Sequence, residues 1–136
     1  MRINFSYVQA GFNEETGEPI LFWKSLVEGD EVLARRYKLY ICHTLPAVAQ
    51  TDGDCARLLD FIVMAAGGEG EFETGGNDVT LTIKKSGVQV DIEVNDDWVG
   101  QEDGFFTLEE WRKVVVGWRD FIGMVPDLSA SLTVDI

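Results

Sequence analysis

One amphipathic helix near the C-terminal end constrains the fold more than any other feature of the chain. Thr107 and Glu110 form the T-x-x-E pattern of a capping box, and Phe106 can pack against Trp111 as a hydrophobic staple. At about 100° per residue, the apolar residues that follow occupy a stripe about 140° wide, namely Leu108, Trp111, Val114, Val115, Trp118, Phe121 and Ile122. The pattern predicts a helix from about Leu108 to Ile122 that buries Trp111 and Trp118 against another layer of the fold.

A second helix is predicted in the middle of the chain. Thr51-Asp52-Gly53-Asp54 supplies N-cap chemistry, and Gly67-Gly68 is typical of a helix end. Between them, the apolar residues that fall on one side of a helix are Cys55, Leu58, Leu59, Ile62, Ala65 and Ala66. This helix is therefore also expected to bury a single face.

Alternating apolar and polar residues predict strands elsewhere in the chain. Segments with this period are 3–7, 36–43, the hairpin 79–94 and 131–136, and the apolar run 19–23 is a further strand. Pro19 confines that strand to beginning there or to lying at an edge. We therefore predict an α+β fold in which a mainly antiparallel sheet has the two helices packed on one face. Since the 136 residues contain no repeat and no Pro/Ser-rich linker, we expect residues 1–136 to form a single domain.

The net charge of the chain limits the classes of molecule that it can bind. The chain has 24 acidic and 11 basic residues, so its net charge is 11 − 24 = −13. Such a charge repels phosphate backbones and anionic lipid surfaces and attracts cations, so we expect neither nucleic acid nor a membrane as partner. The first residues lack the layout of a signal peptide, and no stretch is apolar enough to span a membrane, which predicts a cytoplasmic protein. Cys42 and Cys55 are expected to be free thiols.

The most informative asymmetry is an acidic segment between Ser86 and Trp111, which holds eight acids and no Lys or Arg. If the strand of the hairpin continues far enough, Asp91, Glu93 and Asp97 share the face opposite its apolar residues. One interpretation is a solvated sheet face, and the other is a surface for a cationic partner, because like charges crowded on neighbouring strands destabilise a sheet. On the second interpretation, the predicted partner-binding residues are Asp91, Glu93, Asp96, Asp97, Trp98, Glu102 and Asp103.

Trp98 stands apart from the tryptophans of the helix stripe because it lies in a predicted loop between carboxylates. An aromatic side chain inside an acidic rim is typical of a hot spot for a basic partner. The alternative is a loop tryptophan that folds back onto the core. The role of the short run Gly75-Gly76-Asn77 also has two interpretations, since it is either a functional loop or only a turn.

No motif predicts catalysis, a metal or a cofactor. Asp103, Thr107 and Glu110 take the fifth, ninth and twelfth positions of a calcium-binding EF-hand loop, but Val99 stands where the first carboxylate is needed. The single histidine, His43, follows a predicted strand, and Cys42 beside it would point to the opposite face. Phosphate-binding glycine loops and nucleophile elbows are absent from the sequence. We therefore expect no metal, no cofactor and no enzymatic activity.

The order of motifs in the second half of the chain resembles small bacterial immunity proteins, which are encoded beside polymorphic or contact-dependent toxins. The resemblance covers about residues 72–122 and consists of Phe72 to Asp78, a hairpin, the acidic loop, Phe106 to Trp111 and Trp118 to Ile122. It implies an inhibitor that binds one cognate toxin, often a basic nuclease, and shields its active site. It supplies no interface residues, so the predicted site depends on charge and exposure alone.

Three hypotheses about function follow. The leading one is an acidic protein that neutralises a basic toxin by direct binding through the acidic segment. The second is a small enzyme or ligand-binding domain with a pocket between sheet and helices near His43. The third is a structural or regulatory subunit that self-associates through an exposed strand, and the sequence leaves the oligomeric state open.

Overall fold

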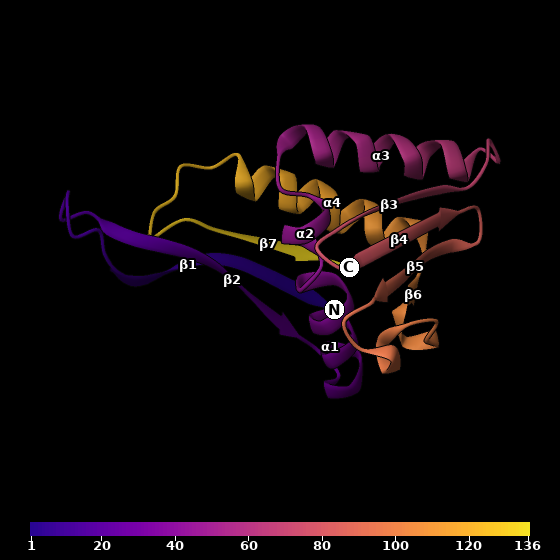
Figure 1. Cartoon of the computed structure of the whole chain (residues 1–136), viewed down its shortest axis with the longest axis horizontal. Coiled ribbons are helices and arrows are strands. Elements are labelled where there is room, and N and C mark those ends of the chain that lie inside the picture. Colours follow the sequence, from indigo (N-terminus) through magenta and orange to yellow (C-terminus); the bar gives the residue numbers. More distant parts are fainter.

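The computed structural model describes residues 1–136 and places every strand in one of two antiparallel sheets. The first sheet has the strand order β2-β1-β7, and the second has the order β3-β4-β5-β6. Figure 1 shows the two sheets with the helices between and above them. The α+β class and the antiparallel pairing are thus confirmed, whereas the strands form two sheets in place of the single one we expected.

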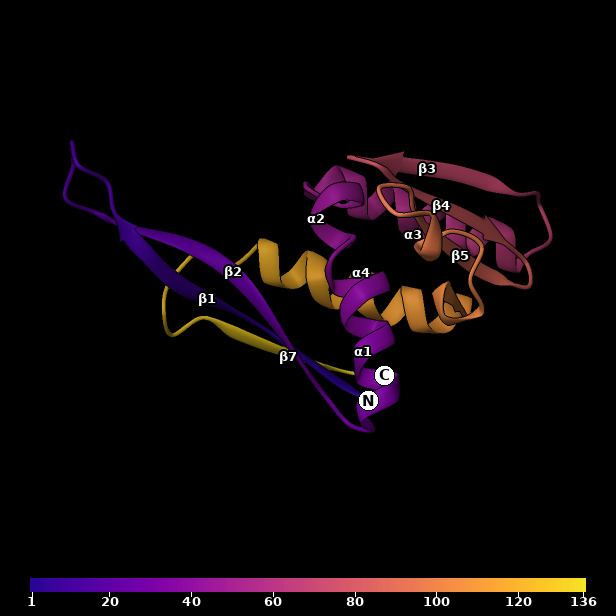
Figure 2. The same ribbon diagram turned by 60° about the horizontal axis from the view of Figure 1, so that its bottom comes forward.

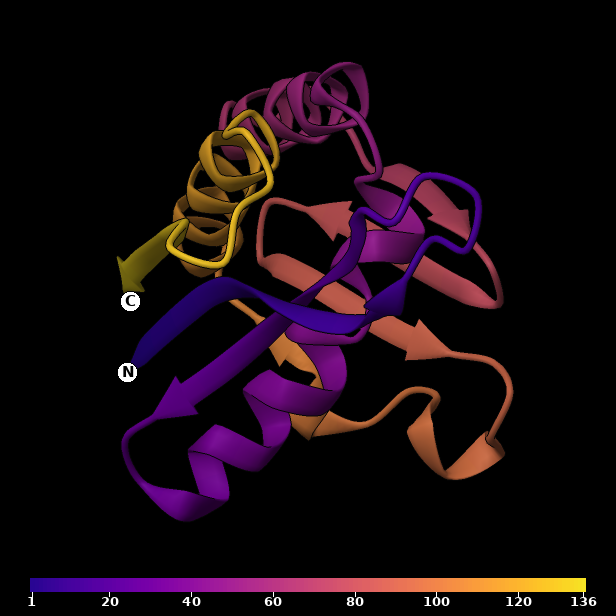
Figure 3. The ribbon, with the colours of Figure 1, turned by 90° about the vertical axis from the view of Figure 1, so that its left-hand side faces the viewer.

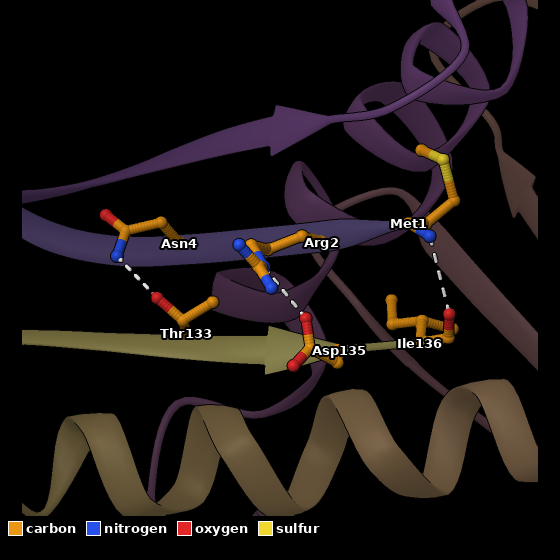
Figure 4. Close-up of polar contacts among 6 residues, drawn as sticks. All are labelled: Met1, Arg2, Asn4, Thr133, Asp135 and Ile136. Atoms are coloured by element: carbon orange, nitrogen blue, oxygen red, sulfur yellow. Dashed lines mark hydrogen bonds and ion pairs between the residues drawn. The ribbon is translucent and has the colours of Figure 1, made fainter.

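The first sheet joins the two ends of the chain. Strand β1 (Arg2–Phe12) pairs with β2 (Pro19–Glu28) on one side and with β7 (Ser131–Asp135) on the other. Side chains reinforce the second pairing, as Figure 4 shows: Arg2 Nε donates to Asp135 Oδ1 at 2.8 Å, and Asn4 Nδ2 donates to Thr133 Oγ1 at 3.0 Å. The strands predicted at 3–7, 19–23 and 131–136 are confirmed, and the first two extend further than predicted.

The second sheet is a meander. Strands β3 (Phe72–Gly76), β4 (Val79–Lys84) and β5 (Gly87–Ile92) pair in succession, and the two-residue β6 (Phe105–Phe106) closes the far edge against β5. The predicted hairpin 79–94 is confirmed as β4 and β5, although its second strand ends at Ile92. Val79, Leu81 and Ile83 of β4 and Val88, Val90 and Ile92 of β5 form its buried face.

Both predicted helices are confirmed, and both begin with a complete capping box. In α3 (Asp52–Ala66), Thr51 accepts from the backbone N–H of Asp54. In α4 (Leu108–Ile122), the N–H of Glu110 donates to the Thr107 hydroxyl at 3.0 Å, and Glu110 accepts from the N–H of Thr107 at 3.0 Å. These bonds satisfy backbone donors that a helix start otherwise leaves unpaired, which is why the two starts are readable in the sequence.

Helix α4 occupies the centre of the molecule, with Trp111 and Trp118 buried as predicted. Its apolar side meets the first sheet through Phe5, whose ring centroid lies 5.2 Å from that of Trp118. Gly117 allows β7 to approach closely, since a Cβ there would lie 2.1 Å from Val134 Cγ2. Helix α3 packs beside α4 and covers the second sheet (Figures 1 and 2), and one cluster of 26 buried residues runs through all of these elements.

The strand predicted at 36–43 is wrong, because this stretch is helical. Asp30 caps α1 (Glu31–Tyr37) by accepting from two backbone N–H groups, and the chain continues through a π-turn (Lys38–Cys42) into the short α2 (Leu45–Val48). The buried residues of this stretch recur every three or four positions, and they include Tyr37, Tyr40, Ile41, Thr44, Leu45 and Val48. The sequence thus has a helical spacing as well as the strand-like alternation of Tyr37, Leu39 and Ile41. The structure follows the helical spacing, because that spacing buries both tyrosines.

Candidate functional site

Between β5 and β6, the acidic segment forms two short helical turns and does not continue as a strand. After β5 ends at Ile92, the chain forms one 3₁₀ turn at Asp96–Trp98 and another at Glu102–Gly104 before β6. Asn95 starts the first turn by accepting from the N–H of Asp97 at 3.0 Å. The stripe of carboxylates that we expected along one strand face therefore stops at Ile92, and Val94 is two-thirds exposed.

Two of the predicted site residues help to hold this segment in place. Asp91 Oδ1 accepts from the N–H of Gly100 at 2.7 Å, which ties the segment back to β5. Glu93 accepts from the Thr80 hydroxyl of the neighbouring strand, and its N–H donates to Asp78 O at 2.7 Å. The carboxylates of Asp91 and Glu93 are thus partly occupied by bonds within the fold.

The other four predicted acids are exposed and project from the two turns. They are Asp96, Asp97, Glu102 and Asp103. Asp97 and Asp103 also border a shallow cleft of about 400 Å³ whose opposite wall is α1, with Arg35 and Arg36. A segment that has no base in the sequence thus has two arginines beside it in space. Sequence reasoning missed these arginines because they lie more than sixty residues away from the acids, and because the strand predicted at 36–43 included Arg36.

Arg36 connects α1 to the acidic segment. Its Nε donates to Asp103 O at 2.9 Å, and its Nη2 donates to Phe105 O at 2.5 Å. The guanidinium carbon also lies 4.1 Å from the centroid of the Phe106 ring, within the range of a cation–π contact. Since Arg36 bonds backbone carbonyls and not carboxylates, it fixes the position of the acids without neutralising any of them by a direct ion pair.

A second contact across the same junction joins α1 to α4. The Tyr37 hydroxyl donates to Glu110, the residue that also completes the α4 capping box. Burial and this hydrogen bond raise the pKa of Tyr37 to about 12. Burial acts to raise the pKa of Glu110, but hydrogen bonds from Tyr37 and Thr107 outweigh it and hold that pKa below its ordinary value. Helix α1 is therefore held in place by Tyr37 as well as by Arg36.

Trp98 forms one wall of the main groove of the molecule. The groove has a volume of about 510 Å³ and runs between the turn into α2 and the end of the second sheet. Its apolar lining includes Leu39, Pro46, Ala47 and Val94, and its polar lining includes His43 and Asn77. Trp98 is half-buried and packs against the edge of the core. The packing on the core that we considered for this tryptophan is thus observed in part, and the rest of its side chain faces the groove.

His43 is exposed at the groove, where the helical course of the chain separates it from buried Cys42. The pocket near His43 that the second hypothesis requires therefore exists. Burial raises the pKa of Cys42, and it raises the pKa of Cys55 to about 11. Both thiols are free and stay protonated at neutral pH, so neither is prepared to act as a nucleophile.

The run Gly75-Gly76-Asn77 ends strand β3 and begins the tight turn beside the groove. Asn77 and Asp78 both have positive φ, at 43° and 64°, and connect β3 to β4 as the central pair of a two-residue hairpin. Gly76 is required by packing, since a Cβ there would lie 2.3 Å from Ala47 O of α2. This turn therefore positions α2 against the second sheet, and it presents Asn77 to the groove.

Carboxylates continue beyond this turn. A shallow depression of about 430 Å³ shares Asn77 and Val79 with the groove, and its other lining residues include Glu73, Asp78 and Glu93. The groove thus has a mostly apolar lining, Asp96 and Asp97 precede its Trp98 in the chain, and the acids of the depression lie next to it. No Lys or Arg side chain lines either cavity.

Two further findings concern metals and membranes. No group of three or more His, Cys, Asp or Glu side chains gathers where it could hold one metal ion. No helix combines the length and the apolar character that crossing a membrane requires.

Comparison of the chain with models of known protein families, with characterised proteins and with solved structures found no significant match.

Proposed function

We propose that this protein binds a basic protein partner through the groove beside Trp98 and the acids around it, and that it neutralises that partner in the manner of an immunity protein. The observation that supports the proposal best is the composition of this surface. An apolar groove walled by Trp98 adjoins the depression that Glu73, Asp78 and Glu93 line, and the exposed Asp96 and Asp97 directly precede Trp98 in the chain.

Such a surface suits a cationic side chain with an apolar stem. The stem of an arginine or lysine can pack on Trp98, Val94 and Pro46, while its charged head reaches the carboxylates at either end. Desolvated aromatic anchors inside a polar rim carry most of the binding energy at protein interfaces. The surrounding acids raise the encounter rate with a basic partner through long-range attraction. Shielding a phosphate-binding active site is one way in which such a complex would inhibit a nuclease.

The first experiment uses the gene neighbourhood. The protein encoded directly upstream is expressed in a host cell with and without this chain, and growth is measured. We expect growth arrest by the neighbour alone and rescue by this chain. A neighbour that does not arrest growth, or an arrest that this chain leaves unchanged, contradicts the immunity role.

The second experiment tests the surface with charge reversal. Asp96→Lys/Asp97→Lys should slow association with the neighbour's product about tenfold or more at low ionic strength and should flatten the dependence of the on-rate on salt. The control is Asp60→Lys/Asp120→Lys, which makes the same charge change at exposed positions of α3 and α4. If both variants slow association equally, net charge alone drives binding and the proposed surface is wrong.

A small-ligand function remains the second candidate because His43, Thr44 and Asn77 converge on the same groove. Mostly apolar pockets of this size with a few polar groups are typical ligand sites. It predicts that a panel of small cationic amphiphiles contains a compound that raises the melting temperature of the wild type but not that of His43→Ala. A panel without such a compound argues against this candidate and leaves the protein-binding proposal intact.

A further inference from the structure

The β1–β2 hairpin extends beyond the sheet that anchors it. Strand β7 pairs only with residues Arg2–Ser6 of β1, whereas β1 and β2 remain paired with each other as far as Phe12 and Pro19. The outer half of the hairpin therefore projects from the body as a two-stranded arm, which Figure 2 shows in profile and Figure 3 from its tip. Two-stranded hairpins in water are marginally stable unless a further strand or layer covers them.

The free edge of this arm is the outer side of β2. Strand β2 lies at the end of the sheet order, so one row of its backbone groups has no strand partner. Glu18 O faces β1, where it accepts from Asn13 N at 2.8 Å, and Ser25 O faces the other way, where it accepts from Lys38 Nζ. Backbone direction alternates along a strand, so the N–H and C=O groups of Leu21 and Trp23 also face outward. Beside Trp23 and Lys24 the edge borders a small cavity that Lys38 and His43 also line, and α1 and the π-turn both contact β2.

The side chains along this open edge form a self-complementary series. On the outer face of the arm, the order is Glu18, Ile20, Phe22 and Lys24: an acid, two apolar residues and a base. If a second copy of the strand is laid antiparallel about Leu21, each Glu18 stands opposite Lys24 of the other copy and each Ile20 stands opposite Phe22. Opposite-charge and apolar cross-strand pairs both stabilise a sheet.

We propose that two copies of this chain associate through β2, with the two strands antiparallel and Leu21 at the two-fold axis. The open backbone groups of Leu21 then bond to their counterparts, and the N–H of Trp23 bonds to Pro19 O of the second copy. Pro19 has no N–H to contribute, and in this register it stands at the end of the paired segment, where the loss is smallest. The two three-stranded sheets become one continuous sheet across the dimer.

The exposure and charge of the arm favour a second copy as its partner. Phe22 is 57% exposed and Ile20 is 39% exposed, and the proposed pairing brings them into contact. The rest of the chain carries a large negative charge, which opposes the approach of two copies over most of their surface. Residues 18–24 are neutral overall, because Glu18 and Lys24 balance, so this edge is a place where two such acidic chains can meet. This dimer does not depend on the proposed function.

The test exploits the symmetry of the charge pairs. Analytical ultracentrifugation of the full chain should show a concentration-dependent dimer. Glu18→Lys alone and Lys24→Glu alone each place like charges opposite one another and should weaken the dimer about tenfold. The double variant Glu18→Lys/Lys24→Glu should restore it. An equimolar mixture of the two single variants should form a heterodimer, because every pair in that complex is again between opposite charges.

Two results would overturn the proposal. The first is a chain that stays monomeric up to about millimolar concentration, at which even a weak pairing is visible; the arm would then serve a different partner. The second is a dimer whose stability neither single variant changes, which would place the interface elsewhere. Far-ultraviolet circular dichroism of each variant checks that the fold is retained, and Glu28→Lys, outside the paired segment, is the control for a change of net charge.

Discussion

Replacing Arg36 by methionine should release the acidic segment from the body of the protein. Methionine keeps an apolar stem over Phe106 but removes the bonds to Asp103 O and Phe105 O and the cation–π contact. A hydrogen bond to a charged group is worth about 1.5–3 kcal/mol when it is shielded from water. Arg36 is half-buried, so the two bonds count for less than their full value, and the cation–π contact adds about 0.5–1 kcal/mol.

We therefore expect Arg36→Met to lower the free energy of unfolding by about 2–3 kcal/mol. Equilibrium urea unfolding measures this change, and hydrogen exchange should show faster exchange at the backbone amides of residues 96–105. Arg35→Met is the matched control, since Arg35 is exposed on the same helix and makes only an ion pair with Glu31. That variant should change stability by about 0.5 kcal/mol or less. If the two variants lose equal stability, or if residues 96–105 exchange no faster in Arg36→Met, the tether that we assign to Arg36 does not exist.

Two further predictions concern α4. Trp118 Nε1 donates to buried Ala49 O at 2.8 Å, whereas the N–H of equally buried Trp111 has no partner, so Trp118→Phe should cost about 1–3 kcal/mol more than Trp111→Phe in thermal or urea unfolding. Equal losses would contradict this. The folded-state pKa of Glu110 lies below its ordinary value of 4.5, so the stability that its charge contributes is complete above that value and is lost as the pH falls through the lower one. Glu110→Gln should therefore be less stable than the wild type at pH 7, and the difference should shrink below pH 4.5, which unfolding curves across pH 3–7 can measure. A difference that stays constant with pH would contradict the role of the charge.

The sequence predicted those elements whose signals are local. Thr107 with Glu110, and Thr51 with Asp54, satisfy the first backbone groups of their own helices, so the starts of α4 and α3 depend on contacts three residues apart. The strands with a clear period of two, such as Val79 to Ile83, were predictable for the same reason. The prediction for segment 36–43 was wrong because its residues fit both the period of a strand and that of a helix. Only the burial of Tyr37 and Tyr40 in the folded chain distinguishes the two.

The candidate site was partly visible in the sequence. The acidic segment and Trp98 stood out by composition, and five of the six predicted acids are exposed in the structure. A pocket near His43 was one of the hypotheses, but its walls could not be predicted, because they come from segments thirty or more residues apart: Leu39 to Ala47 on one side, and Asn77 to Trp98 on the other. Arg36 was missed for a similar reason, since nothing near residue 103 in the sequence indicates a base.

Neighbouring residues and overall composition are enough to predict the α+β class, the two capped helices, the antiparallel hairpins and the acidic character of the surface. Tertiary packing decides that the strands divide into two sheets, that α4 lies between them, and that the π-turn and α2 form one side of the groove. Those outcomes depend on which apolar faces can be buried together. Phe5 and Trp118, or Gly76 and Ala47 O, are far apart in the sequence, so their contact follows from the packing of the whole chain and from no local pattern.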